Sequence, residues 1–217
     1  MLTLHSARDS SGTVVRLVAA VAGVALTTRQ HTLAGPRSAR LLTLNPTGSL
    51  PVLETPDGPV SETGAILLWL AEKHGLCPGP AEPGRTAFLK WLFYLSNTVH
   101  ADLRQLIYPE RYGPPDTEAG QVTLAAGRFL ISLTHLDEAA RRNPALFPPG
   151  GVLTSYMLIL ARWATICTEG NVRWFTLSAF PAIEALGRAT EALPEMQRIA
   201  REEGLGKFAF TDPSGDC

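Results

Sequence analysis

The sequence is poor in the residues that build metal centres and disulfide frameworks. It has three cysteines in 217 residues, far apart and without a Cys-x-x-Cys pair, so neither a zinc site nor a disulfide framework is indicated. The five histidines show no ligand spacing such as His-Glu-x-x-His, and we therefore expect no metal. Sparse, unpaired cysteines fit a reducing setting, and we expect a cytoplasmic protein.

Neither an excess of one charge nor a long apolar run is present. The chain has 19 basic and 20 acidic side chains, a formal net charge of −1 and no basic patch, so nucleic acid and anionic membranes are not expected partners. The most apolar early segment, Val14 to Leu26, is too short to span a bilayer and contains Arg16. Because no small-residue cleavage site follows it, we expect no signal peptide.

The first 76 residues alternate between strand and helix patterns. Short alternating runs predict strands, and apolar residues at helical spacing predict helices that end at glycines. The predicted order is strand, helix, strand, helix, a hairpin with Asp57-Gly58 at its tip, and a last helix. A strand-helix-strand unit requires a parallel pair and the hairpin adds antiparallel strands, so we expect a small mixed α/β sheet. The strands fall at Leu2–Ser6, Val24–Leu33 and within VLETPDGPV, and the helices at Thr13–Gly23, SARLLTL and Glu62–His74.

A proline- and glycine-rich segment, Leu76 to Gly84, divides the chain. Its composition excludes regular structure, and we place an interdomain linker at residues 77–84. From Arg85 onward only helical patterns remain, three long and two shorter. We therefore expect a domain over residues 1–76 and an all-α domain over 85–217, built as a bundle of five helices.

Two motifs in register resemble the cytosolic glutathione transferase family. NPTGSLPVL resembles the family's Asn-Pro-x-Gly-x-hydrophobic-Pro-hydrophobic-Leu segment, and SETGAILLWLAE resembles its Glu-Ser-x-Ala-Ile helix start. The segments LSNTVHADLRQLIYPERY and REEGL also look like bacterial members, so the resemblance covers essentially the whole chain. It implies a thioredoxin-like first domain of four strands and three helices, glutathione as co-substrate, a hydrophobic electrophile, a homodimer and a role in detoxification.

The resemblance assigns glutathione-binding roles to four residues. Pro51 would be cis, and the backbone of Leu50 would pair antiparallel with the cysteine of glutathione. Thr63 and Glu62 would hold the γ-glutamyl carboxylate and amino group at a helix start, where free N–H groups suit an anion. The same residues also fit ordinary structural roles, since a trans proline can open an edge strand and acidic or hydroxyl residues are common at helix starts.

The thiol of glutathione must lose its proton, and the family places the hydrogen-bond donor for the sulfur after the first strand. That turn reads SARDSSG here, with neither tyrosine nor cysteine, so Ser10 and Ser11 are the candidates and we favour Ser10. Both serines could instead simply cap the following helix. Asp9 would oppose a thiolate unless its side chain points away, and it departs from the serine classes of the family.

The resemblance places the electrophile against the first long helix of the second domain. Tyr94, His100, Leu103, Arg104 and Tyr108 are candidates for that wall, although this spacing is also typical of a buried helix face. We expect Trp163 and Cys167, one turn apart on a later helix, to belong to the core.

Conjugation of glutathione to an electrophile is the function that the resemblance favours. Glutathione-dependent isomerisation of a small dicarboxylate would need cationic pocket residues, for which Arg8 and Arg104 are available. Disulfide reduction needs only glutathione binding and control of the thiolate. A non-catalytic binding or regulatory protein would retain the fold without the thiol donor.

Overall fold

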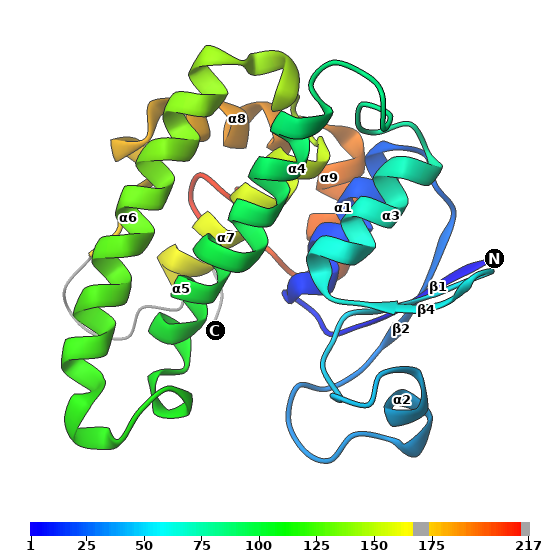
Figure 1. The fold of residues 1–217 in the computed structure, drawn as a ribbon, viewed down its shortest axis with the longest axis horizontal. Coiled ribbons are helices and arrows are strands. Elements are labelled where there is room, and N and C mark those ends of the chain that lie inside the picture. Colours follow the sequence, from blue (N-terminus) through cyan, green and yellow to red (C-terminus); the bar gives the residue numbers. More distant parts are fainter. Residues whose placement is uncertain (167–173, 214–217) are drawn as a thin grey trace.

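The structure is a computed structural model that describes residues 1–166 and 174–213. Figure 1 shows two parts side by side, a sheet with its helices and a larger group of helices, and the last described helix of the chain lies next to the first helix of the sheet part. No helix in the described ranges is long and apolar enough to cross a membrane. The predicted core position Cys167 lies outside these ranges.

The sheet has four strands in the order β2-β1-β3-β4. Strand β1 (Leu2–Ser6) runs parallel to β2 (Leu26–Gln30) and antiparallel to β3 (Val52–Thr55), and β3 forms a hairpin with β4 (Gly58–Ser61). The mixed sheet predicted from the sequence is confirmed. Strand β2 is shorter than predicted because its ladder ends where Gln30 pairs with Ser6, the last residue of β1.

Three helices accompany the sheet. Helices α1 (Ser11–Val21) and α3 (Thr63–Lys73) contact each other on one face, and the short α2 (Ala39–Leu44) lies on the opposite side (Figure 1). Helix α1 buries four branched aliphatic side chains, Val14, Val15, Leu17 and Val18. This packing fixes the α1 N-terminus at the end of β1, where Gly12 is required, since a methyl group there would lie 1.9 Å from Ser6 Oγ.

The remaining described elements are helical. The first long pattern forms α4 (Arg85–Tyr94), one π-helical turn (Leu95–Val99) and α5 (His100–Ile107), which follow one another without a break. The long helix predicted there is present, and its α-helical geometry is interrupted by one π-helical turn. The other four patterns form α6 (Glu118–Arg142), α7 (Val152–Ile166), α8 (Pro181–Glu191) and α9 (Pro194–Glu203).

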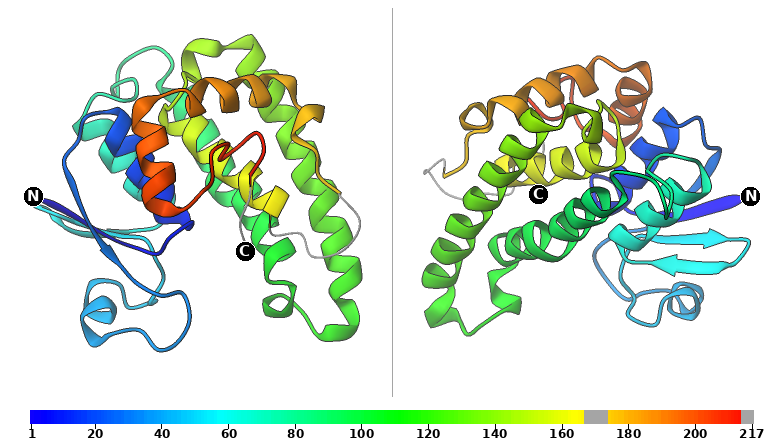
Figure 2. Two further views of the ribbon diagram at one scale, coloured as in Figure 1. Left: turned by 180° about the vertical axis from the view of Figure 1, so that it is seen from behind. Right: turned by 45° about the horizontal axis from the view of Figure 1, so that its top comes forward.

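The two parts share one apolar core, with α7 in its centre and α1 packed against α7 and α9 (Figure 2). Residues 74–84 form neither helix nor strand. The division into domains 1–76 and 85–217 with a linker at 77–84 stays a prediction, because burial is continuous between the parts.

Candidate functional site

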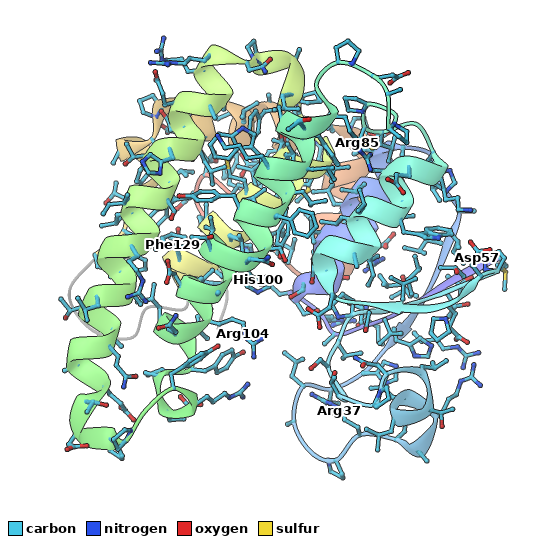
Figure 3. All side chains as sticks on the ribbon, viewed as in Figure 1. Arg37, Asp57, Arg85, His100, Arg104 and Phe129 are labelled. Atoms are coloured by element: carbon cyan, nitrogen blue, oxygen red, sulfur yellow. The ribbon has the colours of Figure 1, made fainter. Side chains whose placement is uncertain are left out.

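A cavity of about 420 Å³ lies where the two parts face each other. The turn after β1, the loop before α2, the residues before β3 and the start of α3 contribute one side, and α5 and α7 contribute the other. Figure 3 shows His100 and Arg104 on the helical side and Arg37 on the other side of this gap. The predicted site residues that line the cavity are Ser10, Ser11, Leu50, Pro51, Glu62, Thr63, His100, Arg104 and Tyr108.

The two serines of the turn have different surroundings. Ser10 is the N-cap of α1: its buried hydroxyl donates to Ala7 O at 2.7 Å and accepts from the Gly12 N–H at 3.3 Å. Ser11, the first residue of α1, is partly exposed, and its hydroxyl has no hydrogen-bond partner in the described part of the chain. Of the two hydroxyls, that of Ser11 is therefore the one free to donate to a ligand in the cavity.

Asp9 is held between the two parts of the molecule. Its backbone has a positive φ of 44°, and its N–H donates to Glu203 Oε2 at 2.9 Å. Its carboxylate accepts hydrogen bonds from Arg162 Nη2 at 2.7 Å and from Trp163 Nε1 at 3.0 Å. Arg162 is fully buried and also donates to Leu205 O and Ala209 O, each at 3.0 Å. The charge of Asp9 is thus compensated by a buried guanidinium.

The first side of the cavity presents backbone groups that are not used in secondary structure. The Leu50–Pro51 peptide bond is cis, as expected from the sequence. The β3 ladder begins at Val52, and the backbone N–H and C=O of Leu50 are not paired with other described residues. This arrangement leaves an N–H and a C=O side by side at the cavity, where an extended peptide could pair with them.

The N-terminus of α3 also opens on the cavity. Thr63 begins this helix, is buried and has no partner for its hydroxyl within the described ranges. No side chain caps the helix, and the preceding residue, Glu62, is exposed with a φ of 70°. Gly64 lets this terminus approach the π turn closely, since a methyl group there would lie 3.1 Å from Ser96 Oγ. Free N–H groups and a positive dipole end suit a carboxylate.

Three residues along α5 and its C-terminal end form the opposite wall. His100, Arg104 and Tyr108 lie one turn apart from each other and all line the cavity. His100 Nδ1 lies 2.8 Å from the Tyr156 hydroxyl. Burial, assisted by the nearby charge of Arg104, lowers the pKa of His100 to about 4, so its imidazole is neutral at neutral pH. Burial raises the pKa of Tyr156, which therefore stays protonated.

Two candidates for this wall prove to be structural. The Tyr94 hydroxyl donates to Ser132 Oγ at 3.0 Å and lies 3.1 Å from His135 Nδ1, outside the cavity. Leu103 belongs to the apolar core. Both residues follow the other interpretation of this spacing, a helix face packed inside the protein, because the α4–α5 segment packs against α6 with one face and lines the cavity with another. Trp163 is buried as expected but also lines the cavity.

Sequence reasoning missed several lining residues, among them Arg37 and Tyr156. Arg37 Nε donates to Gly48 O at 2.9 Å and its Nη1 to Thr32 O at 2.7 Å, so this side chain ties together the loops beside the cavity. Neither residue stands in a motif, and their positions depend on how distant segments pack. Among the described residues no three His, Cys, Asp or Glu side chains come together as a metal site would require.

The same arrangement of a sheet part and a helical part occurs in solved structures. A glutathione S-transferase from a sphingomonad, solved with glutathione, matches with a TM-score of 0.77 at 21% identity, over 94% of this chain and 100% of that one. A glutathione transferase of Phanerochaete chrysosporium with oxidized glutathione matches with a TM-score of 0.80 at 18% identity, over 94% and 95%. The chain therefore has the glutathione transferase fold, with a thioredoxin-like sheet part and a helical part.

A family model matches the first part of the chain. Residues 1–72 match the model described as glutathione S-transferase, N-terminal domain. Among curated proteins the chain resembles probable elongation factor 1-gamma 2 of Arabidopsis thaliana, at 27% identity over 212 residues, which are 91% of this chain and 48% of that protein. Elongation factor 1-gamma 3 of Oryza sativa subsp. japonica is 29% identical over 120 residues, 52% of this chain and 29% of that protein. The chain thus spans about half the length of the first of these relatives and less of the second.

Proposed function

We propose that this protein is a glutathione transferase, which joins the sulfur of glutathione to a carbon of an electrophilic small molecule. The observation that carries this proposal is the hydroxyl of Ser11, which has no partner in the described ranges and lies at the α1 N-terminus on the cavity. The backbone of Leu50 and the uncapped start of α3 line the same cavity, so one tripeptide could contact all three features.

Glutathione would bind as an added strand anchored at one end. The backbone N–H and C=O of Leu50 would pair with its cysteine residue. Its γ-glutamyl carboxylate would accept from the N–H and hydroxyl of Thr63, and Glu62 would accept from its amino group. This orientation directs the thiol away from α3 and toward the turn that holds Ser11.

The chemistry requires a thiolate at neutral pH. A free thiol has a pKa of about 8.5, and a shift of two units corresponds to about 2.7 kcal/mol of preference for the anion. A hydrogen bond to a charged group contributes about 1.5–3 kcal/mol, and a helix N-terminus adds to it. The thiol proton passes to solvent, the sulfur–carbon bond forms, and the bond from that carbon to the leaving group breaks, with the electron pair departing on the leaving group.

Titration of glutathione into the protein, with thiolate absorbance followed as a function of pH, tests this proposal. We expect the bound thiol to ionise well below its free pKa in the parent protein and at a pKa about one to two units higher in the Ser11→Ala variant. Glutathione that binds with an unshifted thiol would refute the transferase proposal. Isomerisation and disulfide reduction use the same thiolate, and product analysis with each substrate type separates them from conjugation.

The second candidate is a binding or regulatory protein without catalysis. It is favoured by the curated relatives, whose names are those of elongation factors and not of transferases. A protein of this kind has no need for an available thiol donor or γ-glutamyl site. Absence of glutathione binding at millimolar concentration, in a folded protein, would favour it over the transferase.

Several properties of the whole protein follow from the same proposal. We propose a cytoplasmic detoxification enzyme with domains at 1–76 and 85–217. We also propose a homodimer, and the apolar side chains that a partner would cover include Phe93 and Ile131, which are 54% and 59% exposed. Light scattering measures the mass in solution, and a monomer at micromolar concentration would refute the dimer.

A further inference from the structure

Two arginines at the cavity stand out because nothing in the described structure neutralises them. Most described arginines form ion pairs or donate hydrogen bonds, as Arg16 and Arg128 do. Arg8, Arg29, Arg104 and Arg201 do neither with any described residue. Two of these four, Arg8 and Arg104, line the same cavity, one from the turn after β1 and the other from α5.

The other charged side chains at the cavity either contact described residues or have a role in the proposed glutathione site. The carboxylate of Asp9 is bound by Arg162 and Trp163. Arg37 donates to the carbonyls of neighbouring loops, although Figure 3 shows it across the gap from Arg104. Glu62 stands at the start of α3, where the amino group of glutathione is proposed to bind. The cavity therefore has two exposed arginines in its lining, Arg8 and Arg104, whose positive charges no described residue pairs.

The remaining groups on this side are aromatic and polar. Tyr108 stacks against a guanidinium, with the Arg111 Cζ 4.1 Å from its ring centre. Tyr112, a further lining residue, is 44% exposed. The Tyr156 hydroxyl forms a hydrogen bond with the neutral imidazole of His100. The phenolic rings can pack against an unsaturated or aromatic ligand, and the guanidinium groups can bind an anionic group of that ligand. This site differs from the purely apolar pocket that a hydrophobic electrophile would need.

We propose that the second substrate is an anionic electrophile, an unsaturated or aromatic molecule whose carboxylate is bound by Arg104 and Arg8. This inference rests on the proposed glutathione transferase function and names the substrate class of the same site. A guanidinium presents a planar fork of donors that matches a carboxylate, and such pairs are stronger than neutral hydrogen bonds. Arg8 and Arg104 carry like charges at the rim of one cavity, and the carboxylate of a ligand bound there would offset them.

A matched pair of product analogues tests the inference without requiring turnover. The probes are S-benzylglutathione and S-(4-carboxybenzyl)glutathione, which differ in one carboxylate, and the measurement is the dissociation constant by calorimetry at neutral pH. We expect the carboxylated probe to bind at least about tenfold tighter, as one charge-assisted hydrogen bond provides. Arg104→Gln should remove most of this difference and Arg8→Gln part of it. Arg142→Gln, a surface variant on α6, should leave it unchanged.

Each other result has a distinct meaning. Equal binding of both probes to the parent protein would overturn the inference and leave the proposed function intact. Equal weakening of both probes and of glutathione itself by Arg104→Gln would also overturn it, because the arginine would then hold the glycine carboxylate of glutathione. Failure of glutathione and both probes to bind the folded protein would refute the proposed function, and the inference would fall with it.

Discussion

Replacement of Ser11 by alanine is the most direct perturbation of the proposed chemistry. The Ser11 residue is partly exposed at the first position of α1, and its hydroxyl has no hydrogen-bond partner among the described residues, so its removal breaks no hydrogen bond within that part of the protein. The loss should therefore appear in the ionisation of bound glutathione and not in folding. Ser11→Thr retains a hydroxyl and should behave nearly as the parent protein does.

The size of the effect follows from the hydrogen bond that is lost. A bond from a hydroxyl to a charged group contributes about 1.5–3 kcal/mol, and each 1.36 kcal/mol corresponds to about one pKa unit. The pKa of the bound thiol should rise by about one to two units in Ser11→Ala. Part of the shift remains, since the α1 N-terminus still faces the sulfur. Below the pKa, the rate of conjugation falls by the same factor as the thiolate fraction, while the affinity for glutathione changes little.

Ser10→Ala is the matched control in the neighbouring position. Ser10 caps α1 by accepting from Gly12 N–H, so its removal should lower the free energy of unfolding by about 1 kcal/mol. Its hydroxyl proton is committed to Ala7 O at 2.7 Å, and the thiol pKa should stay unchanged. The assignment of the donor to Ser11 is refuted if Ser10→Ala raises the thiol pKa and Ser11→Ala does not.

Two further predictions concern buried charge. Arg162→Met should lower the free energy of unfolding by about 3–5 kcal/mol, because Asp9 loses its ion-pair partner. The control, Arg142→Met on the surface, should lower it by about 0–1 kcal/mol. Equal losses for the two variants in denaturant titrations would contradict this prediction. His100 has its pKa lowered from 6.5 to about 4, so the unfolded chain binds more protons between these values and stability falls as the pH drops through this window. His100→Gln should reduce that fall in the urea midpoint, and an unchanged pH dependence would show that the imidazole is not buried neutral.

The order of elements was predictable because each depends on local pattern. The apolar face of α1, the Asp57-Gly58 turn and the prolines between residues 77 and 84 all act within a few residues of themselves. The π turn at Leu95–Val99 was not predictable, since its sequence continues the helical pattern on both sides. This turn contacts α6 and α7, and contacts between distant segments of this kind leave no pattern within the segment itself.

The candidate site was predictable where it depends on motifs and not where it depends on distant contacts. Leu50, Glu62 and Thr63 follow from segments that resemble a family, and all three line the cavity. The two serines differ because the hydroxyl of Ser10, and not that of Ser11, donates a hydrogen bond to Ala7 O. Side-chain rotamers within one turn decide this difference. The pairing of Arg37 with loop carbonyls likewise leaves no periodic signal in the sequence.

Asp9 shows how the helical part controls the electrostatics of the turn. A free carboxylate beside the sulfur would raise the pKa of the thiol and oppose catalysis. Arg162 on α7 neutralises it through contacts of 2.7–3.1 Å, although the two residues are 153 positions apart in sequence. Adjacent opposite charges largely cancel at the cavity, so the positive end of α1 dominates there. The Arg162→Met variant should therefore raise the pKa of bound glutathione as well as lower stability. An unchanged thiol pKa in that variant, measured while it is still folded, would show that the ion pair serves folding alone.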